Sequence, residues 1–130
     1  MAARSRITWA TILRIGLALP GTEVGTAWRS PALKVRGRMF AVIPTHRSAE
    51  PRSLCVCIPF RDRDDLLAAD PGTYYIEEHY LEYPCVLVRL DRVHPDALRD
   101  LLRMGWTFES KKPPLKPKRK AIPSRSASRR

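Results

Sequence analysis

The sequence predicts an α+β fold, a two-layer sandwich in which helices cover one face of an antiparallel β-sheet. Apolar residues recur at helical spacing near both ends of the region before residue 110, and between them short runs alternate apolar with polar residues, as half-buried strands do. Glycine and proline separate most of these runs. The expected element order, α-β-β-β-β-α-β-β-α, is typical of an antiparallel sheet with its helices on one side.

The first helix is expected over residues 5–19. One face carries apolar residues at spacings of three and four: Trp9, Ile12, Leu13, Gly16 and Leu17. Ser5 or Thr8 is a suitable N-cap. Pro20 ends the helix because proline disfavours helical backbone in the residue before it.

Four strands are expected next, at about residues 24–28, 32–36, 39–43 and 53–59. The second strand alternates apolar residues with Lys34 and Arg36, which places both cations on its outer side. Gly37 and Arg38 are expected at the centre of a two-residue hairpin turn with glycine first. Segment 53–58 is almost wholly apolar, which indicates a central, covered strand.

The second half repeats these signals. Asp62 is expected to be the N-cap of a short helix. Two more strands are expected at residues 73–80 and 85–90. The last helix is expected to begin at Pro95, with His94 as its N-cap, and to end at Gly105.

The charge of the chain is concentrated at its C-terminal end. Residues 1–110 carry 15 Lys and Arg against 13 Asp and Glu, whereas residues 111–130 carry nine Lys and Arg, four prolines and no acid. A segment of that composition cannot bury a core. The sequence therefore predicts one α+β domain over residues 1–110 and a disordered basic tail over residues 111–130.

The three cysteines, Cys55, Cys57 and Cys85, provide no disulfide framework. The first two would share one face of a strand, and no second pair follows at zinc-ligand spacing. Buried thiols in a reducing cytoplasm are therefore expected. No apolar run approaches the ~20 residues of a membrane span, and Arg14 interrupts the one segment that imitates a signal peptide.

Several strings in this order resemble the MmcQ/YjbR family of small bacterial proteins: LPGTEVGTAW, VRGRMF, YYIEEHY, YPCVLVRLDRV and a closing LRDLL with GW. The resemblance covers roughly residues 5–110. It implies a frataxin-like (CyaY-like) arrangement and a DNA-binding role, which the family is described as performing through a double-wing motif of hairpins. The wings would here be residues 32–43 and 74–90.

The residues that this hypothesis assigns to nucleic acid are basic: Arg29, Lys34, Arg36, Arg38, Arg89, Arg92, Lys111, Lys112, Lys116, Lys118, Arg119 and Lys120. Cations that neutralise phosphates release counterions, so the tail would give salt-dependent affinity. The alternatives are a solubilising tail, or one that meets a membrane or acidic protein, and a solvated strand face whose charges protect an edge.

Trp28, His79 and Tyr80 are the candidates for a pocket. His79 with Glu77 suggests an acid/base pair or half of a metal site, but a structural histidine near a strand end is favoured because no further ligand cluster is apparent. Trp28 and Trp106 can stack on bases or pack in the core, and core packing is favoured. No catalytic or nucleotide-binding motif occurs, so neither an enzyme nor a cofactor or metal is expected.

The sequence thus favours a small, non-enzymatic, cytoplasmic DNA-binding protein. In this hypothesis the tail supplies electrostatic affinity and the hairpin cations orient the domain on the phosphate backbone. The alternative is a protein-interaction or small-ligand module with a pocket near Trp28, His79 and Tyr80 and a tail that only solubilises.

Overall fold

The computed structural model describes residues 7–114. Lys116, Lys118, Arg119 and Lys120, and with them most of the expected tail, lie outside the described residues. Residues 111–114 of that tail are described, and two of them contact the domain: Lys112 Nζ donates to Glu109, and the Pro113 carbonyl accepts from Arg38 Nε at 2.8 Å.

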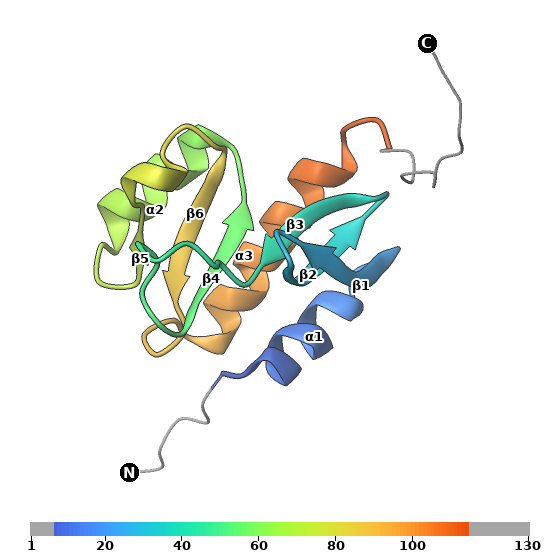
Figure 1. Cartoon of the computed structure of the whole chain (residues 1–130), viewed down its shortest axis with the longest axis horizontal. Helices are drawn as coiled ribbons and strands as arrows, with labels where there is room; N and C mark the ends of the chain where they lie inside the picture. The colour runs from blue at the N-terminus through green and yellow to red at the C-terminus, as the bar shows by residue number, and fades with distance from the viewer. Residues whose placement is uncertain (1–6, 115–130) are drawn as a thin grey trace.

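The fold is the expected α+β sandwich (Figure 1). Its elements are α1 (Trp9–Leu17), β1 (Thr22–Ala27), β2 (Ser30–Val35), β3 (Arg38–Val42), β4 (Ser53–Cys57), α2 (Phe60–Ala69), β5 (Tyr74–Tyr75), the 3₁₀ turn η1 (Glu78–Tyr80), β6 (Cys85–Arg89) and α3 (Pro95–Ser110). The six strands form one antiparallel sheet in the order β1-β2-β3-β4-β6-β5. β4 is central and wholly buried, as the apolar run predicted.

All three helices pack against one face of the sheet. α3 crosses behind β3 and β4 in Figure 1, with α1 beside it. One buried cluster joins these helices to the sheet. It contains Ile12 of α1, Leu98, Leu101 and Leu102 of α3 and inward residues of every strand from β2 to β6. Leu66 and Leu67 of α2 pack against it. α1 begins one residue after Thr8, which caps it in a reciprocal pair with Thr11.

Both hairpin turns are two residues long, and one of them was predicted in the wrong place. Arg36 and Gly37, rather than Gly37 and Arg38, are central in the β2–β3 turn, because Val35 pairs with Arg38. The β1–β2 turn consists of Trp28 and Arg29. All four turn residues have positive φ (54° to 80°), as type I′ turns require.

A bulge at Phe40 adjusts β3 to the helices. Met39 pairs with Lys34 and Ala41 with Leu33, so Phe40 is an extra residue between two partners. The bulge allows both Phe40 and Ala41 to join the helix-side core. It also breaks the simple alternation that the sequence suggested for this strand.

α3 is longer than predicted. Gly105 does not end it; it lies inside the helix, where a Cβ would meet Val56 Cγ1 at 2.8 Å and the main-chain oxygens of Cys57 and Phe40 at 3.0 and 3.2 Å. The glycine is there because α3 touches the sheet backbone, not because the chain turns. The predicted start is confirmed: His94 Nδ1 accepts from the Asp96 amide.

Two other boundaries were wrong. Asp62 is not an N-cap, because α2 begins at Phe60 after Pro59, and Asp62 lies in its first turn. The strand expected over 73–80 stops at Tyr75, and its second half forms the turn η1. The alternation that indicated a strand there came from residues packed over the sheet instead of within it.

The other face of the sheet has its own core. Ala32, Val42, Cys55, Cys85 and Leu87 point to this side and are buried beneath Tyr75 and Tyr80. Ala49 from the β3–β4 loop and Ile76 from the segment after β5 complete the cover. Two loops therefore cover this face of the sheet, whereas helices cover the other.

None of the helices described within residues 7–114 has the length and apolar character of a membrane-spanning segment.

We expect Gly105→Ala to lower the free energy of unfolding by roughly 1–3 kcal/mol, the usual cost of overpacking, although alanine favours a helix. The new Cβ would press on the Val56 side chain and on main-chain oxygens of two strands, and these oxygens cannot move independently of the sheet. Gly16→Ala in α1 is the comparison, since the three atoms nearest to its Cβ would all be side-chain atoms of one residue, Leu33. Urea unfolding of both variants checks this, and equal stabilities would contradict the close approach.

Candidate functional site

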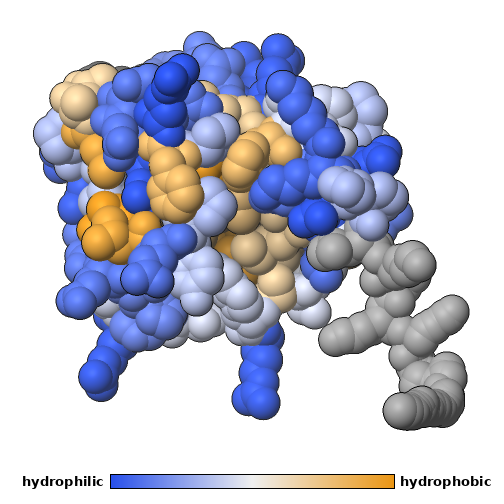
Figure 2. Space-filling model, turned by 90° about the horizontal axis from the view of Figure 1, so that it is seen from above, coloured by the Kyte–Doolittle hydropathy of each residue, from blue (hydrophilic) through white to orange (hydrophobic). Residues whose placement is uncertain are grey.

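A hollow lies on the loop-covered face of the sheet. We call it the aromatic cleft; it has a volume of about 450 Å³ and is lined by Trp28, Thr45, His46, His79, Tyr80 and Tyr83. Trp28 and Tyr83 stay 46% and 55% exposed. The structure thus brings together Trp28, His79 and Tyr80, the three residues of the sequence-based pocket hypothesis. Figure 2 shows one face of the molecule, on which hydrophobic side chains gather between hydrophilic ones.

Two histidines stack face to face in this cleft. The rings of His46 and His79 are 3.7 Å apart with their planes 10° from parallel. His46 Nδ1 accepts from the Ser48 amide at 3.1 Å, which leaves the ring proton of the neutral form on Nε2. Burial, the neighbouring His79 and Arg47 all lower the pKa of His46. The lowered pKa favours the neutral form of the His46 ring.

Tyr80 forms the floor of the cleft. Its side chain is 1% exposed, and its ring meets those of His79 and His46 edge-on and lies 6.2 Å from Trp28. Burial raises the pKa of its hydroxyl. The main chain of His46 lies near this hydroxyl, but within the described residues no hydrogen bond of good geometry reaches it. A buried hydroxyl without a partner is costly and uncommon.

Arg63 of α2 positions the wall that carries Tyr80 and Tyr83. Its guanidinium is buried and donates to the carbonyls of Leu81, Tyr83 and Cys85 at 3.0 to 3.2 Å. It also lies 4.8 Å from the ring of Phe60. These three bonds fix the turn between η1 and β6, which has little regular structure of its own.

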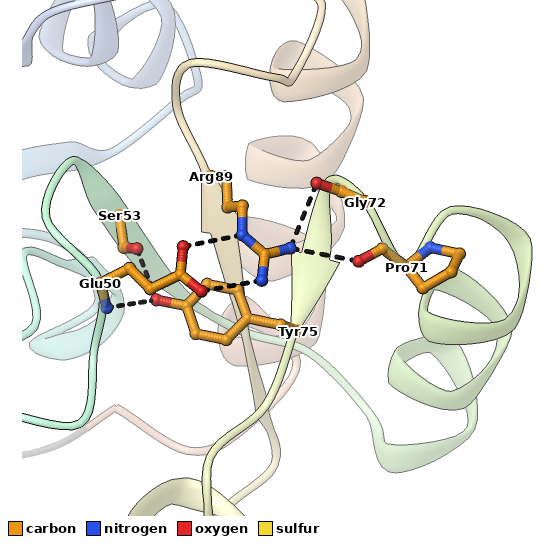
Figure 3. A network of polar contacts seen from close by, with 6 residues as sticks. All are labelled: Glu50, Ser53, Pro71, Gly72, Tyr75 and Arg89. Carbon is orange, nitrogen blue, oxygen red and sulfur yellow. Dashed lines mark hydrogen bonds and ion pairs between the residues drawn. The ribbon is translucent and has the colours of Figure 1, made fainter.

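Arg89 positions the opposite wall (Figure 3). Its guanidinium makes two 2.8 Å bonds to Glu50, donates to the carbonyls of Pro71 and Gly72, and lies 4.4 Å from the ring of Tyr75. The Tyr75 hydroxyl accepts from the Glu50 amide and bonds Ser53. Hydrogen bonding to Arg89 lowers the pKa of Glu50. Arg89 thus holds the loop that carries His46.

The other basic candidates are spread over several elements. Arg29 and Arg36 are exposed in turns at opposite ends of β2, and Lys34, half-buried, lies between them with Glu23 as its cross-strand neighbour. Within the described residues none of these three cations lies within 4 Å of a carboxylate. Arg92 and Lys111 are exposed as well.

Arg38 and Lys112 share a carboxylate at the edge of a second hollow. Glu109, which is buried, lies 3.8 Å from Arg38 and 3.0 Å from Lys112. The hollow, about 270 Å³, also has Trp28 and Tyr83 in its lining, so those two side chains separate it from the aromatic cleft. Two cations against one carboxylate leave it with a net positive charge.

The sequence analysis did not predict that Thr45, His46 and Tyr83 line the cleft. They lie in loops whose packing depends on residues that are distant in the sequence. The suggested pairing of His79 with Glu77 is not formed: within residues 7–114 no hydrogen bond joins them. Trp106 donates to the Pro20 carbonyl and packs against the helix-side core. No group of three or more His, Cys, Asp or Glu in this part of the chain is arranged to hold a metal ion.

The cysteines contribute apolar surface. Cys55, Cys57 and Cys85 are free and buried, as predicted. Burial raises the pKa of Cys57 far above its ordinary value, so this thiol stays protonated and unreactive.

We expect Arg63→Ala to lower the free energy of unfolding by roughly 3 kcal/mol, because one buried and two partly buried carbonyls lose their donor. The matched control is Arg61→Ala, an exposed arginine of the same helix, for which a change within about 0.5 kcal/mol is expected. Chemical denaturation measures both. A similar small effect at both positions would show that the carbonyls are satisfied in another way.

We expect the stability to fall as the pH is lowered below about 6.5, the ordinary pKa of histidine. There the unfolded chain binds a proton at His46 more readily than the folded chain, and the loss is complete once the pH is below the lowered folded pKa. Melting temperatures of wild type and His46→Gln should therefore converge on acidification. Parallel curves would contradict a lowered pKa.

Comparisons with known proteins agree with this fold. The YjbR family model matches residues 17–108. Uncharacterized proteins Rv2570 of Mycobacterium tuberculosis H37Rv and Mb2600 of Mycobacterium bovis are each 30% identical over 121 residues, covering 81% of this chain and 90% of the relative.

A solved structure is similar as well. The crystal structure of Deinococcus radiodurans protein DR2400, with a DUF419 domain, superimposes with a TM-score of 0.66 at 23% identity, covering 85% of this chain and 84% of that one. At this identity the likeness concerns the fold alone. Because the family model spans most of the chain and the α+β fold agrees, this protein belongs to the YjbR family.

Proposed function

We propose that this protein is a non-enzymatic DNA-binding protein, which contacts the phosphate backbone through the cations of its first two hairpins and through the basic tail. One observation carries the proposal. Arg29 and Arg36 occupy type I′ turn positions where asparagine and glycine are the residues of least strain, and both extend into solvent. A positive φ costs an arginine on the order of 1 kcal/mol, so the fold alone does not favour these residues.

The position of the tail supports the same surface. Pro113 accepts a hydrogen bond from Arg38, the first residue after the β2–β3 turn. Pro113 therefore lies beside Arg38 at the start of β3, and seven more basic residues follow position 114 in the sequence. Cations in both parts can then meet one continuous phosphate backbone.

The interface that we propose is smaller than the set of sequence candidates. Arg89 is engaged on all sides by Glu50 and two carbonyls, which supports a structural role for it. Arg38 and Lys112 are partly neutralised by Glu109. Arg29, Lys34 and Arg36 remain the primary residues, with Arg92 and Lys111 as exposed cations at the periphery.

A second candidate function is a small-ligand or protein-interaction module centred on Trp28, His79 and Tyr80. The observation in its favour is that these residues line one cleft, whose walls are each held by a buried or half-buried arginine. In that function the basic tail would only solubilise the protein.

We expect the full chain to bind duplex DNA with an affinity that falls steeply with salt. Replacing Arg29, Lys34 and Arg36 together by Asn, Gln and Asn should reduce the slope of log K against log salt by about 0.9 for each phosphate that is no longer neutralised. Asparagine keeps the positive φ of the two turns acceptable. Fluorescence anisotropy over a salt series measures the slope.

The matched control removes three exposed cations from the helices instead: Arg14, Arg61 and Arg103, each to Gln. It changes the net charge equally, so an equal reduction of binding in both triple variants would contradict a role for the hairpins. A chain that ends at Pro114 separates the tail from the domain. If that chain did not bind at all, the tail would be the sole source of affinity.

A further inference from the structure

We propose that the aromatic cleft accepts one unpaired nucleobase, so that this protein prefers single-stranded to duplex nucleic acid. The inference rests on the proposed function, and it names the part of the nucleic acid that the loop-covered face takes. It also unites the two candidate functions in one surface, because Trp28 of the cleft and Arg29 of the hairpin cations are neighbours in one turn.

The stacking surfaces are Trp28 and Tyr83. Both are about half exposed, although each is large and aromatic, and both line the cleft. Aromatic side chains on which bases stack are the common device of proteins that bind single strands. Trp28 has a φ of 54°, a conformation that bulky residues rarely adopt. The β1–β2 turn therefore presents this ring at a conformational cost.

The polar groups of the cleft match the edge of a base. Tyr80, whose ring is 1% exposed and whose hydroxyl is turned inward, supplies the aromatic floor beneath a base. His46 in its neutral form has its proton on Nε2, because Nδ1 accepts from Ser48. The exposed stacked ring of His79 extends the flat wall.

The hollow beyond Trp28 and Tyr83 suits the phosphate of the same nucleotide. Arg38 and Lys112 face it with a single carboxylate, Glu109, between them. In this arrangement the base lies in the aromatic cleft and the phosphate lies in the second hollow, on opposite sides of Trp28 and Tyr83. Paired bases in a duplex cannot enter such a cleft without being unstacked, which costs a few kcal/mol.

A preference for single-stranded over duplex DNA is a sharp test of the inference, because the charge of the basic tail favours the duplex. Duplex DNA has the higher charge density, and its electrostatic attraction per neutralised phosphate is the stronger one. A preference of the full chain for single strands must therefore come from contacts with bases. The experiment compares a 12-nucleotide single strand with its own duplex, at one salt concentration, by fluorescence anisotropy.

We expect the full chain to bind the single strand at least tenfold more tightly than the duplex. Tyr83→Ala should lower single-strand affinity about tenfold and leave duplex affinity unchanged. Leu81→Ala, equally exposed in the same loop but not in the cleft lining, is the control.

Equal binding of the two forms, or an equal reduction for Leu81→Ala and Tyr83→Ala, would overturn the base-binding cleft. If duplex binding then still depended on Arg29, Lys34 and Arg36, the proposed function would stand without it. If neither the single strand nor the duplex bound, even at low salt, both the proposed function and the inference would be overturned.

Discussion

The loop-covered face depends on one buried cation, Arg63. Its guanidinium reaches from α2 to three main-chain carbonyls of the segment that leads into β6. A buried charge is tolerated only when hydrogen bonds replace its hydration, and within residues 7–114 no carboxylate lies within 4 Å to share this task. The segment around Tyr83 therefore has its conformation because Arg63 requires those carbonyls.

This constraint explains how a two-layer protein acquires a second core. Helices bury one face of the sheet, and the other would expose Cys55, Cys85 and Leu87 if the loops were free to move. Arg63 secures one loop and Arg89 the other, the latter through Glu50 and Tyr75. The aromatic cleft lies between the two loops, so hydrogen bonds to both arginines hold its walls.

The sequence was sufficient for the architecture because the architecture follows from local patterns. Helical and alternating periodicities placed all three helices and the strands, including the buried central strand β4. The sequence-based prediction failed where the role of a residue depends on contacts with residues that are distant in the sequence. Gly105 has the signature of a helix end but serves contact with the sheet backbone, and the alternation after Tyr75 belongs to a segment packed over the sheet. His46 entered the cleft unpredicted, since nothing local distinguishes it from a solvent-exposed loop histidine.

The two hairpin turns show where this protein departs from the most stable sequence for its fold. Asparagine followed by glycine would relieve the strain in the β1–β2 turn, yet the chain has Trp28 and Arg29 there, both with positive φ and both exposed. In the cleft beneath, the Tyr80 hydroxyl is buried without a partner among the described residues. A strained turn is unfavourable for folding, whereas a flat ligand in the cleft would stack on the Trp28 ring that this turn presents. The strained residue Trp28 is thus also one on which we propose that a nucleobase stacks.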